Sequence, residues 1–347
     1  MHIDLNLNGV RIVRTDAEIE CPAIDTALQA AGAELVLLNG DIDAHSLCNA
    51  LTDAQLLLMC YTPITKEVIS HARHLRGIVK YGVGIDAIDI AAATQAGIPV
   101  VNVPEYAEQT VAEGAFCLML SLMKRLMPLH ATMQQRGWFD PASPWLGNDI
   151  YGKSVAIVGA GRIGCAFARM AGSGFGAHVI GYDPHVSREN MARNGIHKID
   201  DLHTLLNEAD VVSIHTVLNS DTSAMIGAAE FAAMKKKPVF INVSRGALVD
   251  EMALIAALDN HQITAAGLDV FSSEPLNKDT HALKSLYGRD NVILLPHLTF
   301  FTHEAMHRLS EDTLARCIEI LQGKSVTIRS NDPRLQAQKN VLNVAVE

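Results

Sequence analysis

The sequence predicts an α/β protein built from two doubly wound domains, each with a parallel sheet covered by helices. Two observations lead to this prediction. Short apolar runs alternate with amphipathic stretches along most of the chain, as in repeated β-α-β units. The chain also has 347 residues, and single hydrophobic cores rarely grow past about 250 residues.

The first series of elements precedes residue 104. Stretches such as Ile24–Ala31 and Lys66–Ala72 have the apolar spacing of helices. The apolar runs between such stretches are predicted as strands: Arg11–Arg14, Glu34–Leu38, Leu56–Cys60, Gly77–Tyr81 and Pro99–Val103. We therefore expect a first parallel sheet in this part of the chain.

A long apolar segment, Glu105 to Met127, is expected to form one largely buried helix that connects the two domains. The polar stretch Arg136 to Gly152 follows it. A second series of strands is then predicted: Ser154–Val158, His178–Asp183, Val211–His215, Val239–Val243, Ala265–Val270 and Val292–Leu295. The last stretch, Asn331 to Glu347, is polar, and we expect a loosely docked tail there.

Composition excludes several classes of function. The net charge of −10 argues against a nucleic-acid partner, which requires a basic surface. The longest apolar run, Ala115 to Met123, is far shorter than the ~20 residues of a membrane span. The six cysteines lie far apart and lack the spacing of metal ligands, which suits a reducing compartment. Without a secretion signal at the N-terminus, we expect a cytoplasmic protein with no metal and no membrane partner.

A glycine-rich turn follows the strand Ser154–Val158 directly and precedes a helical pattern. In a dinucleotide-binding turn, the first glycine permits the tight bend, the second the approach of the pyrophosphate, and the third the packing of helix on strand. Asp183 lies 19 residues after the last glycine, where a carboxylate can bind the ribose hydroxyls and repel the 2′-phosphate of NADP. The sequence therefore predicts a Rossmann site for NAD with these contacts: Gly159, Gly161, Arg162, Ile163, Gly164 and Asp183.

Three charged side chains follow predicted strands of the second domain, at the sheet edge where open α/β sheets bind ligands. Arg245 has a planar guanidinium that suits a bidentate contact with a carboxylate. Glu274 and His297 follow the next two strands. Reduction of a 2-keto acid needs a cation for the carboxylate, a proton donor and a partner for that donor. Each residue alone also fits an ordinary surface position, and only the three together indicate a site.

Several short segments, in this order, resemble the D-isomer-specific 2-hydroxyacid dehydrogenase family. The similarity extends from about Tyr81 to Thr302. The matching segments are Gly82–Asp86, Val111–Glu113, Gly159–Gly164, Val243–Gly246, Asp269–Phe271, Glu274–Pro275 and Pro296–His297. The resemblance implies an NAD-dependent oxidoreductase that moves a hydride between NAD(H) and C2 of a small D-2-hydroxy acid or 2-keto acid.

The resemblance also implies a role for each site residue. His297 would protonate the carbonyl oxygen during reduction, and Glu274 would hydrogen-bond its far nitrogen and favour the imidazolium. Arg245 would bind the substrate carboxylate. The backbone N–H groups of Val83 and Gly84 would hold the other side of that carboxylate.

The domain organisation follows from the same resemblance. A flavodoxin-like substrate domain would comprise residues 1–103 and 301–347, and a Rossmann domain residues 104–300. The active site would lie in a cleft between them, with Asp269 as a further cofactor contact. We also expect a homodimer.

Two segments bear on the substrate. Asn102–Tyr106 and Leu298–Thr302 resemble the D-lactate dehydrogenase subfamily, so Tyr106 and Phe300 are expected to line the substrate pocket, with core packing as the alternative. Aromatic walls would restrict the substrate to the pyruvate, glyoxylate or hydroxypyruvate class.

Other functions stay open. Phosphoglycerate would need a cation near the third strand, and the segment Met59–Ile64 contains none before Lys66. Formate or phosphite oxidation, and an NAD-sensing interaction protein similar to the C-terminal-binding-protein corepressors, are further alternatives. Turnover of NADH with 2-keto acids distinguishes an enzyme from the interaction protein.

Overall fold

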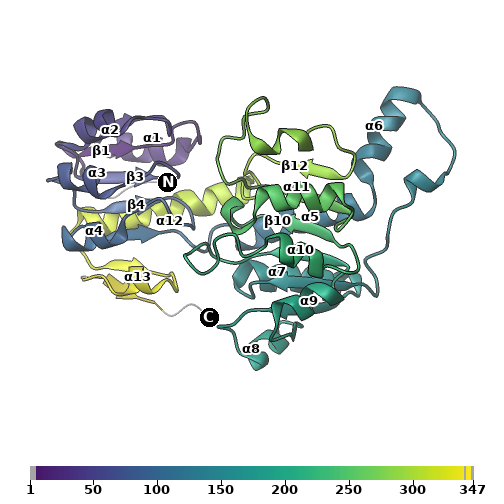
Figure 1. Cartoon of the computed structure of the whole chain (residues 1–347). Helices are drawn as coiled ribbons and strands as arrows, with labels where there is room; N and C mark the ends of the chain where they lie inside the picture. The colour runs from purple at the N-terminus through teal and green to yellow at the C-terminus, as the bar shows by residue number, and fades with distance from the viewer. Residues whose placement is uncertain (1–4, 340, 345–347) are drawn as a thin grey trace. The chain divides into compact units, whose positions relative to one another are not determined.

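The computed structural model describes residues 5–339 and 341–344, and the chain divides into two compact units. Unit 1 extends to Ala107 and resumes at Thr302, and unit 2 comprises Glu108–Phe301. The domain boundaries predicted from the sequence fall after residues 103 and 300. Each unit contains a parallel main sheet with flanking helices (Figure 1), so the predicted fold class is confirmed.

The main sheet of unit 1 has the order β2-β1-β3-β4-β5, which is the flavodoxin-like order. Its strands are β1 (Arg11–Arg14), β2 (Glu34–Leu37), β3 (Leu56–Met59), β4 (Ile78–Lys80) and β5 (Val100–Asn102). Its helices are α1 (Pro22–Ala30), α2 (Ala44–Leu51), α3 (Lys66–His71), α4 (Ile90–Gln95) and α12 (His303–Leu321). Local sequence sets where several helices begin, because Asp43, Thr65, Asp89 and Thr302 each accept a backbone N–H of the first turn.

The C-terminal segment packs on unit 1 more firmly than the sequence predicts. It contains α13 (Pro333–Gln336) and β14 (Val341–Asn343), which pairs with β13 (Val326–Ile328). The buried side chain of Gln338 accepts the N–H of Val100 at 2.8 Å and donates to its carbonyl oxygen at 2.8 Å. The prediction of a loose tail is wrong for this part, because a contact to β5 across 238 residues leaves no local signal. Residues 340 and 345–347 of that segment lie outside the described residues.

The main sheet of unit 2 has the order β12-β11-β10-β9-β6-β7-β8. Counted from its first strand in the chain, this is the Rossmann order with one further strand. The strands are β6 (Ser154–Val158), β7 (His178–Tyr182), β8 (His197–Lys198), β9 (Val211–Ile214), β10 (Val239–Asn242), β11 (Ala265–Leu268) and β12 (Val292–Leu294). Alternate residues of β6 enter different hydrophobic clusters, Val155 and Ile157 in one and Ala156 and Val158 in the other, as expected for a strand covered on both faces.

Two helices replace the single long helix predicted for residues 105–127. Helix α5 (Glu108–Met123) ends before Arg125, whose φ of 52° is left-handed, and α6 (Leu126–Arg136) then begins. The returning chain caps the break, because the N–H of Asn148 donates to the carbonyl oxygen of Met123 at 2.7 Å. The predicted continuous helix is therefore wrong, since a distant segment takes the carbonyl that a continuing helix would use.

Helix α6 and the turn η1 (Ser143–Trp145) project from the rest of unit 2 (Figure 1). The remaining helices and turns of this unit are α7 (Arg162–Arg169), η2 (Met170–Gly174), α8 (Arg188–Arg193), α9 (Leu202–Glu208), α10 (Ala228–Ala233), η3 (Gly246–Leu248), α11 (Glu251–Asp259) and η4 (Ala282–Leu286). Within the described part of the chain, none of the helices is long and apolar enough to cross a bilayer.

Candidate active site

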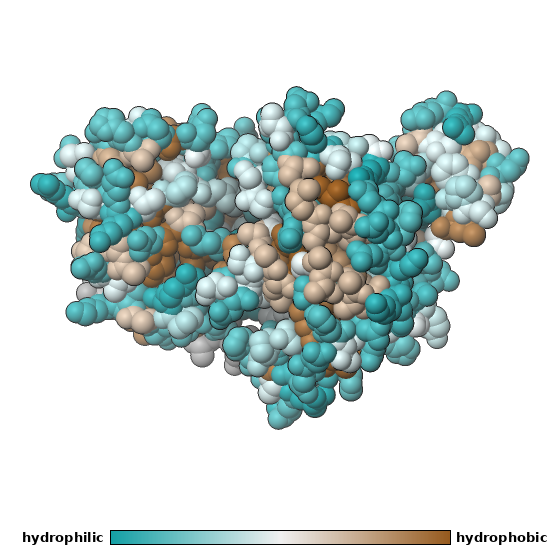
Figure 2. All heavy atoms as spheres, in the orientation of Figure 1, coloured by the Kyte–Doolittle hydropathy of each residue, from teal (hydrophilic) through white to brown (hydrophobic). Residues whose placement is uncertain are grey.

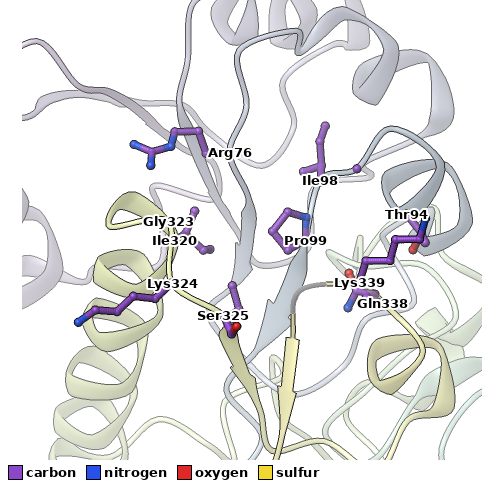
Figure 3. Close-up of a pocket in the computed structure, with 12 residues that line it drawn as sticks. Arg76, Thr94, Ile98, Pro99, Ile320, Gly323, Lys324, Ser325, Gln338 and Lys339 are labelled. Atoms are coloured by element: carbon purple, nitrogen blue, oxygen red, sulfur yellow. The ribbon is translucent and has the colours of Figure 1, made fainter.

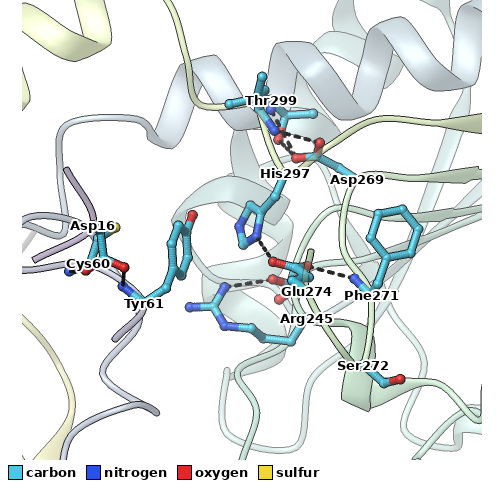
Figure 4. Close-up of polar contacts among 12 residues, drawn as sticks. Asp16, Cys60, Tyr61, Arg245, Asp269, Phe271, Ser272, Glu274, His297 and Thr299 are labelled. Carbon is cyan, nitrogen blue, oxygen red and sulfur yellow. Dashed lines mark hydrogen bonds and ion pairs between the residues drawn. The ribbon is translucent and has the colours of Figure 1, made fainter. Parts of the chain in front are cut away.

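Three neighbouring strands of unit 2 deliver the predicted catalytic residues. Arg245, Glu274 and His297 follow β10, β11 and β12, which lie side by side in the sheet. Because neighbouring parallel strands end at one edge, the three side chains gather there (Figure 4). The structure thus brings together residues that are up to 52 positions apart in the chain.

Glu274 uses both carboxylate oxygens in the site. Its Oε2 lies 2.7 Å from Nδ1 of His297, and its Oε1 accepts the N–H of Phe271 at 2.8 Å. Burial alone would raise the pKa of Glu274, but the hydrogen bond and charge of His297, the N–H of Phe271 and the charge of Arg245 together lower it. The carboxylate is therefore ionised at neutral pH and fixes the imidazole ring through one nitrogen.

Asp269 fixes the turn that carries His297 through hydrogen bonds to the two residues that follow it. This carboxylate is 0% exposed and accepts the N–H groups of Leu298 at 2.9 Å and Thr299 at 3.0 Å. It also accepts the Thr299 hydroxyl at 2.6 Å. Burial raises the pKa of Asp269. His297 itself has a φ of 58°, a left-handed conformation that is uncommon for a residue with a side chain and concentrates at functional sites.

A close approach of two loops brings Arg245 toward Glu274. A Cβ added at Gly246 would lie 1.9 Å from the carbonyl carbon of Phe271, so only glycine fits between these backbones. Nδ2 of Asn242 donates a hydrogen bond to the Arg245 carbonyl oxygen at 2.9 Å. Nη1 of the Arg245 guanidinium donates to the Ser244 carbonyl oxygen at 2.7 Å. Backbone contacts thus set the position of this guanidinium.

The glycine turn has the shape that a dinucleotide requires. Gly159 has a φ of 98°, and a Cβ there would lie 2.7 Å from the backbone of His215. A Cβ at Gly164 would lie 2.2 Å from the Gly159 carbonyl oxygen, so this glycine permits the packing of α7 on β6. A Cβ at Gly161 would meet nothing within 4 Å, and no side chain caps the start of α7. Space and backbone N–H groups for a pyrophosphate therefore coincide at this turn.

Asp183 lies beside this turn. Its Oδ2 accepts the N–H of Ala160 at 2.9 Å, and its Oδ1 accepts the N–H of His185 at 2.9 Å. The carboxylate thus lies at the β7 edge of the glycine turn. Nη1 of Arg162 lies 3.0 Å from Oε1 of Glu108 at the start of α5, so an ion pair orients this predicted cofactor contact.

The other predicted substrate contacts divide between the units. In unit 1, Val83 is exposed and Gly84 half-buried just after β4, and Asn102 Nδ2 donates to the Val83 carbonyl at 2.6 Å. Tyr106 is buried there, and its carbonyl oxygen accepts Nε of Arg308 at 2.8 Å. In unit 2, Phe300 is buried with its ring 6.4 Å from that of His297, centre to centre.

Sequence reasoning missed a buried cation at the end of β3. Lys80 is 4% exposed, and its Nζ donates to the Cys60 carbonyl at 2.5 Å and lies 4.9 Å from the centre of the Tyr61 ring. Asp16 fixes the same loop, because its carboxylate accepts the N–H groups of Cys60 at 2.7 Å and Tyr61 at 3.0 Å (Figure 4). A cation does lie near the third strand, so the argument that none is present there is wrong. The signal was a lysine in the apolar run Gly77–Tyr81.

The fold and the site define the class of this protein as an NAD-dependent oxidoreductase. The family model for the NAD-binding domain of the D-isomer-specific 2-hydroxyacid dehydrogenases matches residues 116–299. The chain belongs to this family, as the resemblance predicted.

Curated relatives and solved structures agree. The chain is 36% identical to glyoxylate reductase of Korarchaeum cryptofilum over 85% of each chain. It is 35% identical to D-3-phosphoglycerate dehydrogenase of Methanocaldococcus jannaschii over 85% of this chain, but it spans only about half of that relative, 55%. D-lactate dehydrogenase of Aquifex aeolicus, solved with NAD and lactic acid, has a TM-score of 0.80 and 28% identity over 90% of this chain and 96% of that one.

Proposed function

We propose that this protein reduces a small 2-keto acid of the glyoxylate, hydroxypyruvate or pyruvate class to the D-2-hydroxy acid. The hydrogen bond of 2.7 Å between Glu274 and His297, at the same sheet edge as Arg245, is the observation that carries the proposal. The relatives named for glyoxylate and D-lactate support the substrate class.

Each side chain has one task in this proposal. Arg245 binds the substrate carboxylate through its planar guanidinium. His297 donates a proton from Nε2 to the carbonyl oxygen, because Nδ1 is held by Glu274. The negative charge of Glu274 stabilises the imidazolium before transfer. When bound, NADH would supply the hydride for reduction and NAD⁺ would accept it in oxidation.

We further propose that unit 1 contributes to substrate binding. The backbone N–H groups of Val83 and Gly84 follow β4 at its carboxyl end, where they can bind the substrate carboxylate. Tyr106 and Phe300 limit the size of the C2 substituent to a hydrogen, methyl or hydroxymethyl group. Asp269 acts mainly by holding the His297 turn, and its expected contact with the cofactor stays a prediction.

A keto-acid panel tests the proposal. Wild-type protein is assayed with glyoxylate, hydroxypyruvate, pyruvate and 3-phosphohydroxypyruvate, each with NADH. We expect His297→Ala to lose ~10²-fold or more in kcat while NADH affinity is retained. His307→Ala is the matched control, because His307 also faces a glutamate, Glu311, at 3.4 Å but lies on the exposed side of α12.

The panel also separates the alternatives. NADH binding without turnover of any keto acid would contradict the proposal and favour the interaction-protein function. Preference for 3-phosphohydroxypyruvate would assign phosphoglycerate metabolism instead. We expect Arg245→Lys to lose most of kcat/KM, because a point charge does not reproduce a bidentate contact. A loss of less than about threefold would show that Arg245 does not bind the substrate.

We also propose that the protein is a cytoplasmic homodimer. Large apolar side chains are exposed on the projecting segment 126–146, where Figure 2 shows a brown patch. Among them Trp138 is 83% exposed and Leu146 is 74% exposed. A second copy presenting the same surface would cover them in a symmetric contact.

All six cysteines lack a disulfide bond, as expected in a reducing compartment. Light scattering should give a dimer for the wild type and a monomer for W138S/L146S. The control is V217S, which removes an apolar residue that is 73% exposed elsewhere on unit 2.

A further inference from the structure

We propose that unit 1 carries a second ligand site, which binds a small molecule with two or more anionic groups. A cavity of about 500 Å³ lies beside the amino ends of β4 and β5 (Figure 3). This volume is within the range of small-molecule sites, about 300–1,000 Å³. Because all strands of the sheet are parallel, the cavity lies at the edge opposite the Val83–Gly84 loop, which follows the carboxyl end of β4. It is therefore separate from the substrate contacts of unit 1.

Charge is the observation that points to an anion. Arg76, Lys324 and Lys339 line the cavity, and no acidic residue does. In the described part of the chain these three side chains form no ion pair with a carboxylate. Like charges around one cavity repel one another. In a chain with a net charge of −10, a cluster of positive side chains without a carboxylate indicates an anion-binding site.

The walls of the cavity are fixed before any ligand binds. Gln338 holds the C-terminal wall to β5 through its two hydrogen bonds with Val100, each 2.8 Å long. Ile320 of α12 packs against Gly77, just before β4, where a Cβ would lie 2.7 Å from the Ile320 side chain. Ile98 and Pro99 add apolar surface. A preformed site loses less entropy on binding than one that must order first.

Helix termini explain only part of the charge. Lys324 follows the carboxyl end of α12, which favours a cation. Arg76, however, precedes a strand, and Lys339 follows α13, which has only four residues and therefore a weak dipole. Near the end of α12, the carbonyl oxygen of Glu319 accepts the backbone N–H of Lys324 at 3.0 Å. Near the end of α4, the carbonyl oxygen of Ala93 accepts the backbone N–H of Ile98 at 2.9 Å. These two carbonyls therefore do not need a cationic side chain. Three cations from three elements are better explained by a shared ligand.

Phosphate and carboxylate groups are the two anions that such a cluster accepts. Three cations favour a ligand with several charges over a monoanion, and the cavity leaves room for a compact scaffold between the charged groups. Pyrophosphate and citrate therefore serve as probes of the phosphate and carboxylate forms of this chemistry.

Calorimetry with matched variants tests the site. Each probe is titrated into protein saturated with NADH, so that the glycine turn is occupied. R76Q/K324Q removes one arginine and one lysine from the cavity. K66Q/R73Q removes the same charges from exposed positions of unit 1 outside the cavity. We expect at least one probe to bind the wild type and K66Q/R73Q equally, and R76Q/K324Q at least ~10-fold more weakly. Turnover without a probe should be the same in all three.

Hydrogen exchange locates the bound probe independently of the variants. Protection should rise in the wild type at residues 96–100 and 322–326, which surround the cavity. Binding of only one probe would identify the phosphate or the carboxylate form of the ligand. Equal affinity of both double variants, binding of neither probe, or protection confined to residues 159–164 would each overturn the proposal.

Discussion

At the residue scale, the chemistry of the site depends on how Glu274 holds His297. The contacts of Glu274 lower the pKa of its carboxyl group. The hydrogen-bonded pair of Glu274 and His297 is therefore intact at pH values above the ordinary pKa of a glutamate. It is lost as the pH falls through the lowered pKa of Glu274. In the proposed reaction, Glu274 holds Nδ1 of His297 while Nε2 donates the proton.

Glu274→Gln should move the alkaline limb of the pH profile for keto-acid reduction to lower pH. A neutral amide can still contact Nδ1 of His297, but it no longer stabilises the positive ring. The measurement is kcat/KM against pH for the two proteins. Glu311→Gln, which alters the exposed pair with His307, is the control and should leave the profile unchanged. An unaltered profile for Glu274→Gln would restrict Glu274 to orienting the ring.

Asp183 governs the choice between the two nicotinamide cofactors in our proposal. Wild-type protein should prefer NADH over NADPH by at least ~30-fold in kcat/KM, about 2 kcal/mol. Asp183→Asn retains an oxygen acceptor for the N–H of Ala160 but removes the charge, so the preference should shrink while the turn stays in place. Asp183→Ala removes both and should also weaken NADH binding. Equal use of the two cofactors by the wild type would show that Asp183 does not face the ribose.

At the scale of elements, the site depends on loops that approach one another more closely than side chains permit. Gly246→Ala would place a Cβ 1.9 Å from the Phe271 carbonyl carbon, and a backbone atom cannot rotate away. The β10 and β11 loops must then separate, which moves Arg245 relative to Glu274. We expect a loss of ~10²-fold in kcat/KM, since displacements of about 1 Å have that effect. A Cβ at Gly174 meets nothing within 4 Å, so Gly174→Ala is the control. Activity within threefold of wild type for Gly246→Ala would show that the loops tolerate separation.

At the scale of the whole molecule, His215, a half-buried residue of unit 2, makes stability depend on pH. Burial lowers the pKa of His215 to about 3. Its Nδ1 is buried without a hydrogen-bond partner, while Nε2 lies 2.8 Å from the Ser213 hydroxyl. The unfolded chain protonates His215 near its ordinary pKa of about 6.5, whereas the folded protein does not. Stability is therefore full above this value and falls as the pH drops toward 3.

His215→Gln should flatten this dependence. The amide can contact Ser213 but does not titrate, so the free energy of unfolding should fall less between pH 6.5 and 5 than in the wild type. Urea unfolding at several pH values measures the two slopes. The variant is expected to be less stable at pH 7 through lost packing with Phe167, whose ring lies 5.3 Å from that of His215. Parallel slopes would assign the pH dependence to other groups.

The sequence by itself determined the features that repeat locally or that follow directly from strand ends. Apolar runs located the strands of both main sheets except β8 (His197–Lys198), because burial on two faces leaves a continuous apolar signal that this short edge strand lacks. The glycine turn and the three strand ends at Arg245, Glu274 and His297 indicated the site, since parallel strands present their carboxyl ends at one edge.

Only the tertiary structure decided the features that depend on distant partners. Asn148 ends α5 by taking its last carbonyl, Gln338 ties the C-terminal segment to β5, and Lys80 places a cation on the loop after β3. The sequence near each position shows no periodicity that specifies the partner, because a hydrogen bond between remote segments depends on how the sheet and helices pack. The cation-lined cavity of unit 1 has the same origin, since its three charges come from segments that are up to 263 residues apart in the chain.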